Sequence, residues 1–591
     1  MEPKEKITEL RKLMKAYNID AFIVPSTDPH QSEYPAERWK ARAWLSGFKG
    51  SAGTVVVMQH KAGLWTDPRY HMRGETELAG SGIELYKFGL MDVPSYGEWL
   101  NQELGEGSVI GFDGNVVSIA EVEKLKNAFQ RKAITVVTQH DLVGELWNDR
   151  PGIPTNPIFI YDEKFAGENR KSKIHRIREK LKAHGADTHL LTALDDIAWT
   201  LNLRGSDVAY NPVAICYLII SSQEVRLFID GKKIPADVKQ VLETDRVVLS
   251  GYEDVVAYLQ QLKPGIRILI DPEKTNCNLK ESISQSSQIV EGVSIPFLMK
   301  AVKNETELNG IRESQIRDGV AMVKWMCWLD GQVGTVPHTE ITVAEKLAEF
   351  RSQGEFFQGL SFGTICGYQA NSAVGHYSSN PETAPTLKPE GILLIDSGGQ
   401  YLDGTTDITR TLTLGNPTSE EKQAFTLVLK CQIKLATLVF PKGTRGDRLD
   451  AIAREPLWGR GWNCRHGIGH GVGYFLNVHE GPQRFREDNA VPLELNMLTS
   501  NEPGVYFEGK FGVRLENLLV TVLREVSEFG EFYGFETDTL CPFDLELVDA
   551  AMLSSDEQSW LNEYHRRVYE TLEPFLLEEE KAWLRKETRQ I

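Results

Sequence analysis

The stretch GILLIDSGGQYLDGTTDITRTLTL, residues 391–414, decides the fold of the C-terminal part of this chain. Its Asp403-Gly404 dipeptide separates an apolar run from an alternating one, which is typical of a β-hairpin. Two acidic residues, Asp396 and Asp407, are therefore predicted to lie on facing strands. Because side chains alternate along a strand, Asp407 shares its side with threonines and faces polar surroundings.

The acidic residues of this hairpin carry different expectations. Asp403 precedes a glycine, and we interpret it as a turn residue. Asp396 follows an apolar run, residues 392–395, where a carboxylate is costly to bury without a partner. The sequence therefore favours a ligand or a charge partner for Asp396.

A second hairpin is predicted in SNEPGVYFEGKFGVRLENLLVTV, residues 500–522. Glu502 and Glu516 lie the same number of residues to either side of Gly509 at its turn, so the two carboxylates are expected to meet across the ladder. Arg514 projects from the same face as Glu516, available to an acidic ligand or a substrate group. Taken singly, Glu502 also fits an ordinary strand end, and Glu516 also fits a salt bridge to Arg514.

Between the hairpins lies a glycine-rich segment, NCRHGIGHGVGYFLNVHEGP (residues 463–482), which carries His466, His470 and His479. Its glycines exclude a helix, so the histidines of HGIGH are not aligned as in a helical zinc site, and no glutamate stands between them. Val472 replaces the third glycine of a GxGxxG phosphate loop. We interpret the glycines as places where the backbone approaches a ligand closely.

The hairpins and the glycine-rich segment together predict a metal site. Four carboxylates and one imidazole that converge would repel one another without cations, and two divalent ions bring four positive charges to four negative ones. An oxygen-rich site with one imidazole suits manganese, with zinc or cobalt as alternatives. Two ions can also hold a bridging hydroxide as a nucleophile. The predicted ligands are Asp396, Asp407, His470, Glu502 and Glu516.

Composition and charge bound the class of protein. With roughly 150 residues per domain, a chain of 591 residues should form three or four domains. The net charge of −18 and the lack of a basic run argue against nucleic-acid binding. The N-terminal segment lacks a secretory pattern and no run of about 18 apolar residues occurs, so we expect no membrane association. Seven scattered cysteines without a CxxC pair favour a reducing cytoplasm.

The first half of the chain contains an internal repeat. KITELRKLMKAYNIDAFIV (residues 6–24) and KIHRIREKLKAHGADTHLL (residues 173–191) share a helix-then-strand order, with apolar positions largely in register. This predicts two related α/β domains joined by a linker that contains proline and glycine. A long helix capped by Asn304 then opens a third domain, which closes with two amphipathic helices. The expected domains are residues 1–160, 161–301 and 302–591.

These motifs, in this order, resemble the aminopeptidase P branch of the pita-bread metallopeptidases, a family that also includes methionine aminopeptidase, prolidase and creatinase. The resemblance covers nearly the whole chain, and the matching features are similar to those of the three-domain cytosolic form. It implies an α/β (α+β) fold in which two creatinase-N-like α/β domains precede a pita-bread metallopeptidase domain. The matching segments are STDPHQSEYPAERWKARAWLSGFKGSAGTVVV, WTDPRY, DSGGQYLDGTTDITRT, HGIGHGVGYFLNVHEGP, SNEPGVY, GVRLEN, FYGFETDTLCPF and WLNEYH.

The resemblance also implies a role for each matching residue. Asp396 would bind one ion through both oxygens, and Asp407 and Glu516 would bridge the two ions. His470 and Glu502 would complete the ligands of the other ion. Three further histidines would hold the peptide carbonyl or the proline and move protons. These are His376 in VGHYS, His466 in HGIGH and His479 in NVHEG.

By the same resemblance, the chain is a hydrolase that releases the N-terminal residue from peptides with proline at position two. The bridging hydroxide would attack the first carbonyl, Glu502 would take its proton, and the ions with His376 or His479 would stabilise the oxyanion. Such an enzyme is specialised because the amide of an Xaa-Pro bond has no N–H. The fixed ring of proline also excludes this bond from sites built for extended amides. A homodimer and a cytoplasmic location are also implied.

Several alternatives remain open. A prolidase shares the ligands but cuts only dipeptides, and it is usually shorter, without the duplicated front half. Methionine aminopeptidase lacks the large N-terminal domains, and creatinase works without the metals. A relative that has lost its metals could serve as a peptide-binding module, although no ligand is missing here. In the first domain, Trp65, Asp67 and Arg69 of WTDPRY are either turn packing or residues that reach toward substrate.

Overall fold

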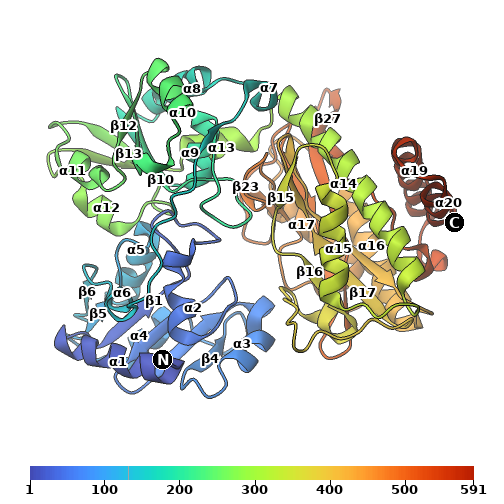
Figure 1. Ribbon diagram of the computed structural model, residues 1–591, viewed down its shortest axis with the longest axis horizontal. Coiled ribbons are helices and arrows are strands. Elements are labelled where there is room, and N and C mark those ends of the chain that lie inside the picture. Colours follow the sequence, from blue (N-terminus) through green and yellow to red (C-terminus); the bar gives the residue numbers. More distant parts are fainter. Residues whose placement is uncertain (131) are drawn as a thin grey trace. The chain divides into compact units, whose positions relative to one another are not determined.

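The computed structural model describes residues 1–130 and 132–591, which divide into two compact units (Figure 1). Among these described residues, no helix is both long enough and apolar enough to cross a membrane. The seven cysteines are all free thiols. The first unit is Met1–Asp162 with Glu168–Phe297, and the second is Glu163–Gly167 with Leu298–Ile591.

The first unit is built from two six-stranded sheets of the same topology. Their strand orders are β4-β3-β2-β1-β5-β6 and β12-β11-β10-β8-β13-β14. In each, the first strand of the repeat pairs antiparallel with one neighbour and parallel with the other. The predicted duplication is therefore confirmed. The strands are β1 (Ala21–Val24), β2 (Thr54–Met58), β3 (Ala62–Thr66), β4 (Glu84–Lys87), β5 (Val109–Gly111), β6 (Thr135–Val137), β8 (Thr188–Leu191), β10 (Cys216–Ser221), β11 (Val225–Ile229), β12 (Val247–Ser250), β13 (Arg267–Ile270) and β14 (Gln288–Glu291).

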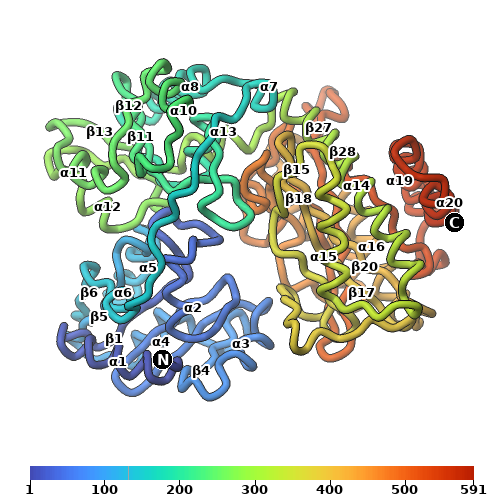
Figure 2. Tube along the Cα trace, viewed as in Figure 1, coloured from blue at the N-terminus to red at the C-terminus, as the bar shows by residue number. Residues whose placement is uncertain are grey.

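The helix that opens each repeat buries equivalent positions. Helices α1 (Pro3–Ala16) and α8 (Arg170–Ala183) each place apolar residues at successive spacings of three and four, so that one stripe faces the adjacent sheet. The chain passes from the first sheet to the second through an extended segment, residues 151–157, which the tube traces plainly (Figure 2). The matching buried residues are Ile7, Leu10 and Met14 in α1, and Ile174, Ile177 and Leu181 in α8.

The WTDPRY motif of the first sheet forms a packed turn. Asp67 caps the short helix η2 (Pro68–Tyr70), and its carboxylate pairs with the Arg69 guanidinium at 2.7 Å. Trp65 is buried and stacks on Tyr86, with 4.2 Å between ring centroids. These contacts favour turn packing as the role of the motif.

The second unit packs helices against small antiparallel sheets. Its sheets have the orders β15-β18-β19, β16-β17-β20, β21-β28-β27-β24-β22-β23 and β25-β26, where β15 is Phe357–Leu360 and β21 is Phe440–Pro441. The strands that position the candidate site are β16 (Ile365–Tyr368), β17 (Ile392–Ser397), β18 (Gly399–Tyr401), β19 (Gly404–Thr405), β20 (Ile408–Thr413), β22 (Gly469–Gly471), β23 (Glu480–Phe485), β24 (Leu498–Asn501), β25 (Gly504–Phe507), β26 (Phe511–Arg514), β27 (Asn517–Ser527) and β28 (Gly530–Thr537).

Long helices cover these strands (Figure 1). As predicted, Asn304 caps α14, because its side chain accepts the Glu307 N–H at 3.0 Å while Glu307 bonds back to the Asn304 N–H. Trp325 and Leu393 belong to one buried apolar cluster between helices and strands. The predicted helix pair closes the chain as α19 and α20. The helices are α14 (Glu305–Gln332), α15 (Glu340–Ser352), α16 (Ser419–Ala436), α17 (Gly446–Ala453), α19 (Ser555–Leu572) and α20 (Glu578–Glu587).

Candidate metal centre

The first predicted hairpin forms in register on both sides of its turn. Strand β17 pairs with β20, and β18 with β19 continues the same alignment to the turn at Asp403. This register places Asp396 opposite Thr409. Asp407 lies just before β20 rather than inside a strand, so the predicted continuous second strand is interrupted there. Both acidic residues are buried, at 8% exposed for Asp396 and 4% for Asp407.

In the second hairpin, Glu502 and Glu516 lie at equivalent positions on the two sides, and the pairing between the two sides is interrupted at these residues. The turn is at Gly509, which has a φ of +72°, and β24 pairs with β27 beyond Glu502 and Glu516 in the same register as β25 with β26. At the opening, the Glu516 N–H donates to Thr409 O at 3.0 Å and the Glu502 N–H donates to Ile468 O at 2.8 Å. Each glutamate is thereby tied to another segment of the site.

His470 lies on β22, the strand between β23 and β24. A Cβ atom at Gly469 would lie 2.1 Å from Ser500 O, so only glycine lets these backbones come together. The expectation that the glycines admit a ligand is corrected at this position, because neighbouring strands occupy the space. The His470 N–H donates to the Ser500 hydroxyl at 3.1 Å, and its Nδ1 is hydrogen-bonded to Gly471 O at 3.0 Å, which leaves Nε2 turned toward the acidic residues.

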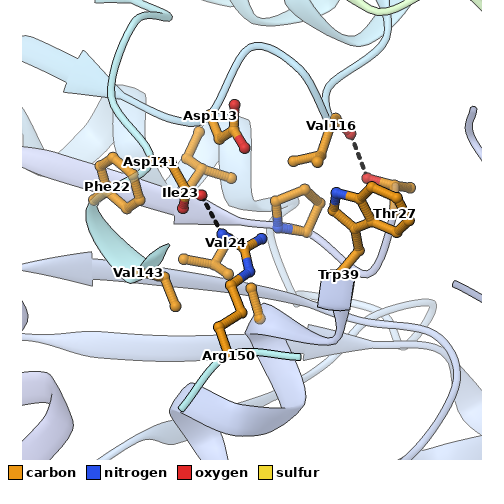
Figure 3. Close-up of a pocket in the computed structure, with 12 residues that line it drawn as sticks. Phe22, Ile23, Val24, Thr27, Trp39, Asp113, Val116, Asp141, Val143 and Arg150 are labelled. Atoms are coloured by element: carbon orange, nitrogen blue, oxygen red, sulfur yellow. Dashed lines mark hydrogen bonds and ion pairs between the residues drawn. The ribbon is translucent and has the colours of Figure 1, made fainter. Parts of the chain in front are cut away.

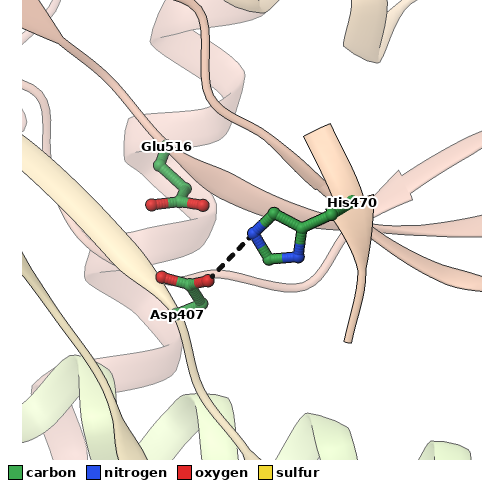
Figure 4. Close-up of side chains that lie close together, drawn as sticks. All are labelled: Asp407, His470 and Glu516. Atoms are coloured by element: carbon green, nitrogen blue, oxygen red, sulfur yellow. Dashed lines mark ion pairs between the residues drawn. The ribbon is translucent and has the colours of Figure 1, made fainter. Parts of the chain in front are cut away.

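Three predicted ligands converge. Asp407, His470 and Glu516 each offer an atom that lies within 4.8 Å of the other two, and the imidazole points at the gap between the carboxylates (Figure 4). His470 Nε2 is 3.5 Å from Asp407 Oδ2 and 3.7 Å from Glu502 Oε1. Glu502 therefore borders the same space.

Asp396, the fifth predicted ligand, is held by one oxygen only. Its Oδ2 accepts a hydrogen bond from Arg514 Nη2 at 2.6 Å. Its Oδ1 is buried and has no hydrogen-bond partner within the described part of the chain. A buried carboxylate oxygen without a donor is costly, so this atom fits a cation ligand.

The site is electrostatically strained without cations. Burial raises the pKa of Asp407 well above its usual range, and the three neighbouring carboxylates raise it further. Burial likewise raises the pKa of Glu516, with Glu502 and Asp396 adding to the shift. Burial also raises the pKa of Glu502, although the positive charges of His466 and Arg514 oppose this. Divalent cations would relieve the repulsion, and the donor set of carboxylates with one imidazole fits such ions.

Arg514 was predicted to face an acidic ligand or a substrate group, and its partners are now defined. Besides Asp396, its Nη1 donates to the Tyr506 hydroxyl at 2.8 Å and its Nε to the Thr409 hydroxyl at 3.2 Å. Each guanidinium nitrogen thus has a protein acceptor, and Arg514 is buried at 4% exposed. These contacts support a role in holding the Asp396 carboxylate, and the substrate role of Arg514 stays a prediction.

The histidines proposed to contact substrate occupy different places. His466 Nε2 and the Tyr506 hydroxyl are hydrogen-bonded at 2.8 Å, so a chain of side chains runs from His466 through Tyr506 and Arg514 to Asp396. Burial lowers the pKa of His466, but Cys464 and Tyr506 outweigh it and raise the pKa well above the ordinary value.

The other two histidines lie on separate segments of the chain. The His479 ring packs edge-on against His470, with 4.3 Å between centroids. His376 is partly buried in the loop that follows η4 (Gln369–Ala373), and η4 packs against β25 and β26.

Sequence reasoning missed a buried network behind the first hairpin. Arg351 of α15 donates to both oxygens of Asp318 on α14, at 2.8 and 2.9 Å. The hydroxyls of Tyr401 and Thr406 donate to Asp318 Oδ1, each at 2.9 Å. Because Thr406 directly precedes Asp407, this network fixes the backbone at a predicted ligand. A charged residue among the buried positions of α14 was the available signal.

Arg410, also missed, links both hairpins to the C-terminal segment. Its side chain is fully buried and donates to Glu516 O at 2.6 Å. On its other side it donates to Pro542 O at 3.0 Å and to the Tyr564 hydroxyl of α19 at 3.1 Å. The C-terminal segment thus supports the backbone of a predicted ligand.

Comparisons with protein-family models match nearly the whole chain. Two matches are described as the creatinase/prolidase N-terminal domain, over residues 6–146 and 149–307. Metallopeptidase family M24 matches residues 309–522, and the C-terminal region of peptidase M24 matches residues 531–591. The paired N-terminal matches agree with the two equivalent sheets.

Known relatives extend over the same length. The chain is 41% identical to a probable Xaa-Pro aminopeptidase P of Laccaria bicolor, covering 99% of this chain and 93% of that protein. It is 40% identical to aminopeptidase P2 of Arabidopsis thaliana, covering 97% and 86%. A crystal structure of X-prolyl aminopeptidase from Caenorhabditis elegans, described as a cytosolic enzyme with a di-nuclear active site, superposes with a TM-score of 0.96 at 34% identity, covering 100% of both chains.

Proposed function

Because this chain belongs to metallopeptidase family M24, as a full-length relative of the Xaa-Pro aminopeptidases, we propose that it releases the N-terminal residue from peptides whose second residue is proline. The observation that carries the proposal is the meeting of Asp407, His470 and Glu516 beside a buried Asp396 oxygen that has no hydrogen-bond partner among the described residues. Such a group of acceptors requires cations, and relatives of this length and similarity are aminopeptidases.

The proposed ligands are those predicted from the sequence: Asp396, Asp407, His470, Glu502 and Glu516. Two divalent ions bound there would supply Lewis acidity toward the scissile carbonyl and a water that is nucleophilic at neutral pH. The oxygen-rich donor set supports manganese as the native metal, with zinc and cobalt as alternatives to be separated by reconstitution.

The chain's own residues would bind, orient and move protons. Glu502 lies beside the predicted ligand His470. Its own carboxylate is the proposed acceptor of the proton from the nucleophile. His376, His466 and His479 are the proposed contacts for the peptide carbonyl and the proline. The hydroxyl of Tyr506 fixes the His466 ring by hydrogen bonding to Nε2, which sets the direction in which that ring can act.

A homodimer in the cytoplasm is the proposed setting. The Caenorhabditis elegans relative is described as cytosolic, and the seven thiols here are free. Light scattering of the purified chain measures the assembly directly: a mass twice that of one 66.5 kDa chain supports the homodimer, and a single-chain mass contradicts it.

Hydrolysis of matched peptides tests the function. Metal-reconstituted protein is expected to cleave an Xaa-Pro-Pro tripeptide at its first bond and to leave an Xaa-Pro dipeptide intact. An Xaa-Ala-Pro tripeptide is the control for the second position. Cleavage of the dipeptide alone would assign a prolidase. A lack of hydrolysis with manganese, zinc and cobalt, together with retained peptide binding, would assign a binding module.

A further inference from the structure

A buried carboxylate outside the metal centre gathers four hydrogen bonds from one loop. Glu340 is the first residue of α15, and its side chain is fully buried. Oε1 accepts the Tyr368 N–H at 2.7 Å and Asn371 Nδ2 at 3.0 Å. Oε2 accepts the Tyr377 hydroxyl at 2.7 Å and the Ser379 hydroxyl at 3.2 Å. Both oxygens are therefore occupied by donors from residues 368–379.

The four donors stand on either side of His376. Tyr368 and Asn371 precede it, and Tyr377 and Ser379 follow it within three residues. A further bond from Asn371 Nδ2 to the Tyr377 hydroxyl, 2.8 Å long, braces the two sides against each other. The Glu340 carboxylate thus closes the segment into a loop with His376 between its fixed points.

The rest of the loop is anchored to the same helix start and to the site. Leu387, beyond the loop, donates its N–H to His338 O at 2.8 Å, just before α15. At the near end, the Gly512 N–H donates to the Ser372 hydroxyl at 2.8 Å, which joins η4 to the strand that ends in Arg514. The loop is held from three directions, and Glu340 is its central support.

The chemistry of the position calls for a carboxylate. An ionised carboxylate is only an acceptor, so it can satisfy four donors at once, and the start of a helix favours negative charge. Burial and the facing Glu340 raise the pKa of Tyr377, which keeps its hydroxyl protonated as a donor. A glutamine would fill the same volume, but its amide nitrogen would oppose the donors on one side.

We infer that Glu340 is a positioning residue that fixes His376 for substrate binding. This inference rests on the proposed function, because it uses the substrate role proposed for His376. The hydrogen bonds described for the Glu340 side chain come from the loop, so Glu340 acts through the loop.

A double-mutant cycle in the full-length, metal-reconstituted chain tests the inference. Glu340→Gln and His376→Ala are made singly and together, and kcat and KM are measured on an Xaa-Pro-Pro tripeptide. A misplaced binding group costs about 10- to 100-fold in kcat/KM, so Glu340→Gln should lower it by that factor while calorimetry finds unchanged metal affinity. In the His376→Ala background, Glu340→Gln should lower kcat/KM by a further factor of less than about two.

Matched variants keep the test falsifiable. Tyr377→Phe removes one donor and leaves the carboxylate, so it should cause a smaller loss of the same kind, even if Glu340→Gln fails to fold. Glu349→Gln, on the exposed side of the same helix, is the control and should change nothing.

Each failure has its own meaning. Loss of metal affinity in Glu340→Gln would overturn the inference. So would a loss of kcat/KM from Glu340→Gln that is as large in the His376→Ala background as in the unmodified chain. Unchanged kinetics of both Glu340→Gln and Tyr377→Phe would do the same while leaving the function intact. Full activity of His376→Ala would instead remove the substrate role of His376, and an inactive unmodified chain would remove the proposed function itself.

Discussion

Arg514 Nη2 donates to Asp396 Oδ2 at 2.6 Å, while Asp396 Oδ1 is buried without a hydrogen-bond partner among the described residues. The carboxylate is therefore asymmetric: protein holds one oxygen, and the other remains as an acceptor. Arg514 is itself held by Tyr506 and Thr409, so the orientation of Asp396 depends on a rigid set of contacts. Partners of this kind orient metal ligands and tune their affinity.

Replacing Arg514 with methionine should weaken metal binding. The change removes the donor that fixes Asp396 and keeps most of the side-chain volume, so affinity for manganese should fall by about 10- to 100-fold. Isothermal titration of the chelator-treated protein measures this. Arg267→Met, at an exposed ion pair of the first unit, is the matched control. An unchanged metal affinity with a raised KM would return Arg514 to a substrate-binding role.

Removing a predicted ligand should have opposite effects with and without metal. When a chelator has removed the metal ions, the four carboxylates repel one another. Asp407→Asn removes one of these charges, so it should raise the melting temperature of the metal-free protein at pH 7.5. With manganese, the unmodified protein should gain stability and the variant should gain much less, because the ions bind the folded site. Thermal denaturation with EDTA and with manganese checks both halves.

The same experiment has a clear contrary result. Glu508→Gln, at the exposed tip of the second hairpin, removes a carboxylate outside the site and should leave both melting temperatures unchanged. If Asp407→Asn lowered the melting temperature in EDTA and gained as much from manganese as the unmodified chain, the proposed ligand role of Asp407 would fail.

Much of the site was predictable because its register is local. The equal spacing of Glu502 and Glu516 about Gly509 predicts their register from sequence alone, and the turn at Asp403 does the same for the first hairpin. The repeat was visible because the apolar positions of the two opening helices have the same spacing. Each of these patterns lies within one short stretch of chain.

The remaining features depend on contacts between distant segments. Nothing near Arg514 in the sequence indicates that it bonds to Asp396 on the other hairpin. The position of Gly469 between two strand backbones gave the same local pattern as a ligand-binding glycine. Glu340 is separated from Tyr377 by the rest of α15, two strands and η4, and only the folded chain shows that the two side chains meet.

Arg410 should be essential for the stability of the second unit. It is fully buried and bonds to the backbone of Glu516 and to the C-terminal segment, so Arg410→Met would leave several buried acceptors without a donor. We expect a loss of about 3–5 kcal/mol, with weaker metal binding. Tyr564→Phe removes one of the bonds of Arg410, together with the bonds of the hydroxyl to Thr539 and Cys541, and should cost less, about 1–2 kcal/mol. Calorimetric melting and metal titration measure both variants, and a loss in Arg410→Met no larger than in Tyr564→Phe would contradict the linking role.

Asp538 should make the protein less stable as pH rises toward neutrality. Burial raises its pKa from 3.8 to about 7, Glu536 adds to the shift, and Arg312 and Arg567 oppose it. Because the folded state holds this proton more tightly than the unfolded chain, stability is highest below the ordinary carboxyl pKa and falls as pH rises through about 4 to 7. Asp538→Asn removes this titration.

The difference in stability between Asp538→Asn and the unmodified chain should therefore change with pH. Relative to pH 4, the variant should gain about 2–4 kcal/mol by pH 8, seen as a rise in its relative melting temperature. Glu536→Gln, which removes only the neighbouring charge, should give a smaller change in the same direction because burial is the larger cause. If the differences in melting temperature between the three proteins stayed constant from pH 4 to pH 8, the pKa of Asp538 would be unshifted in the folded state and the prediction would be wrong.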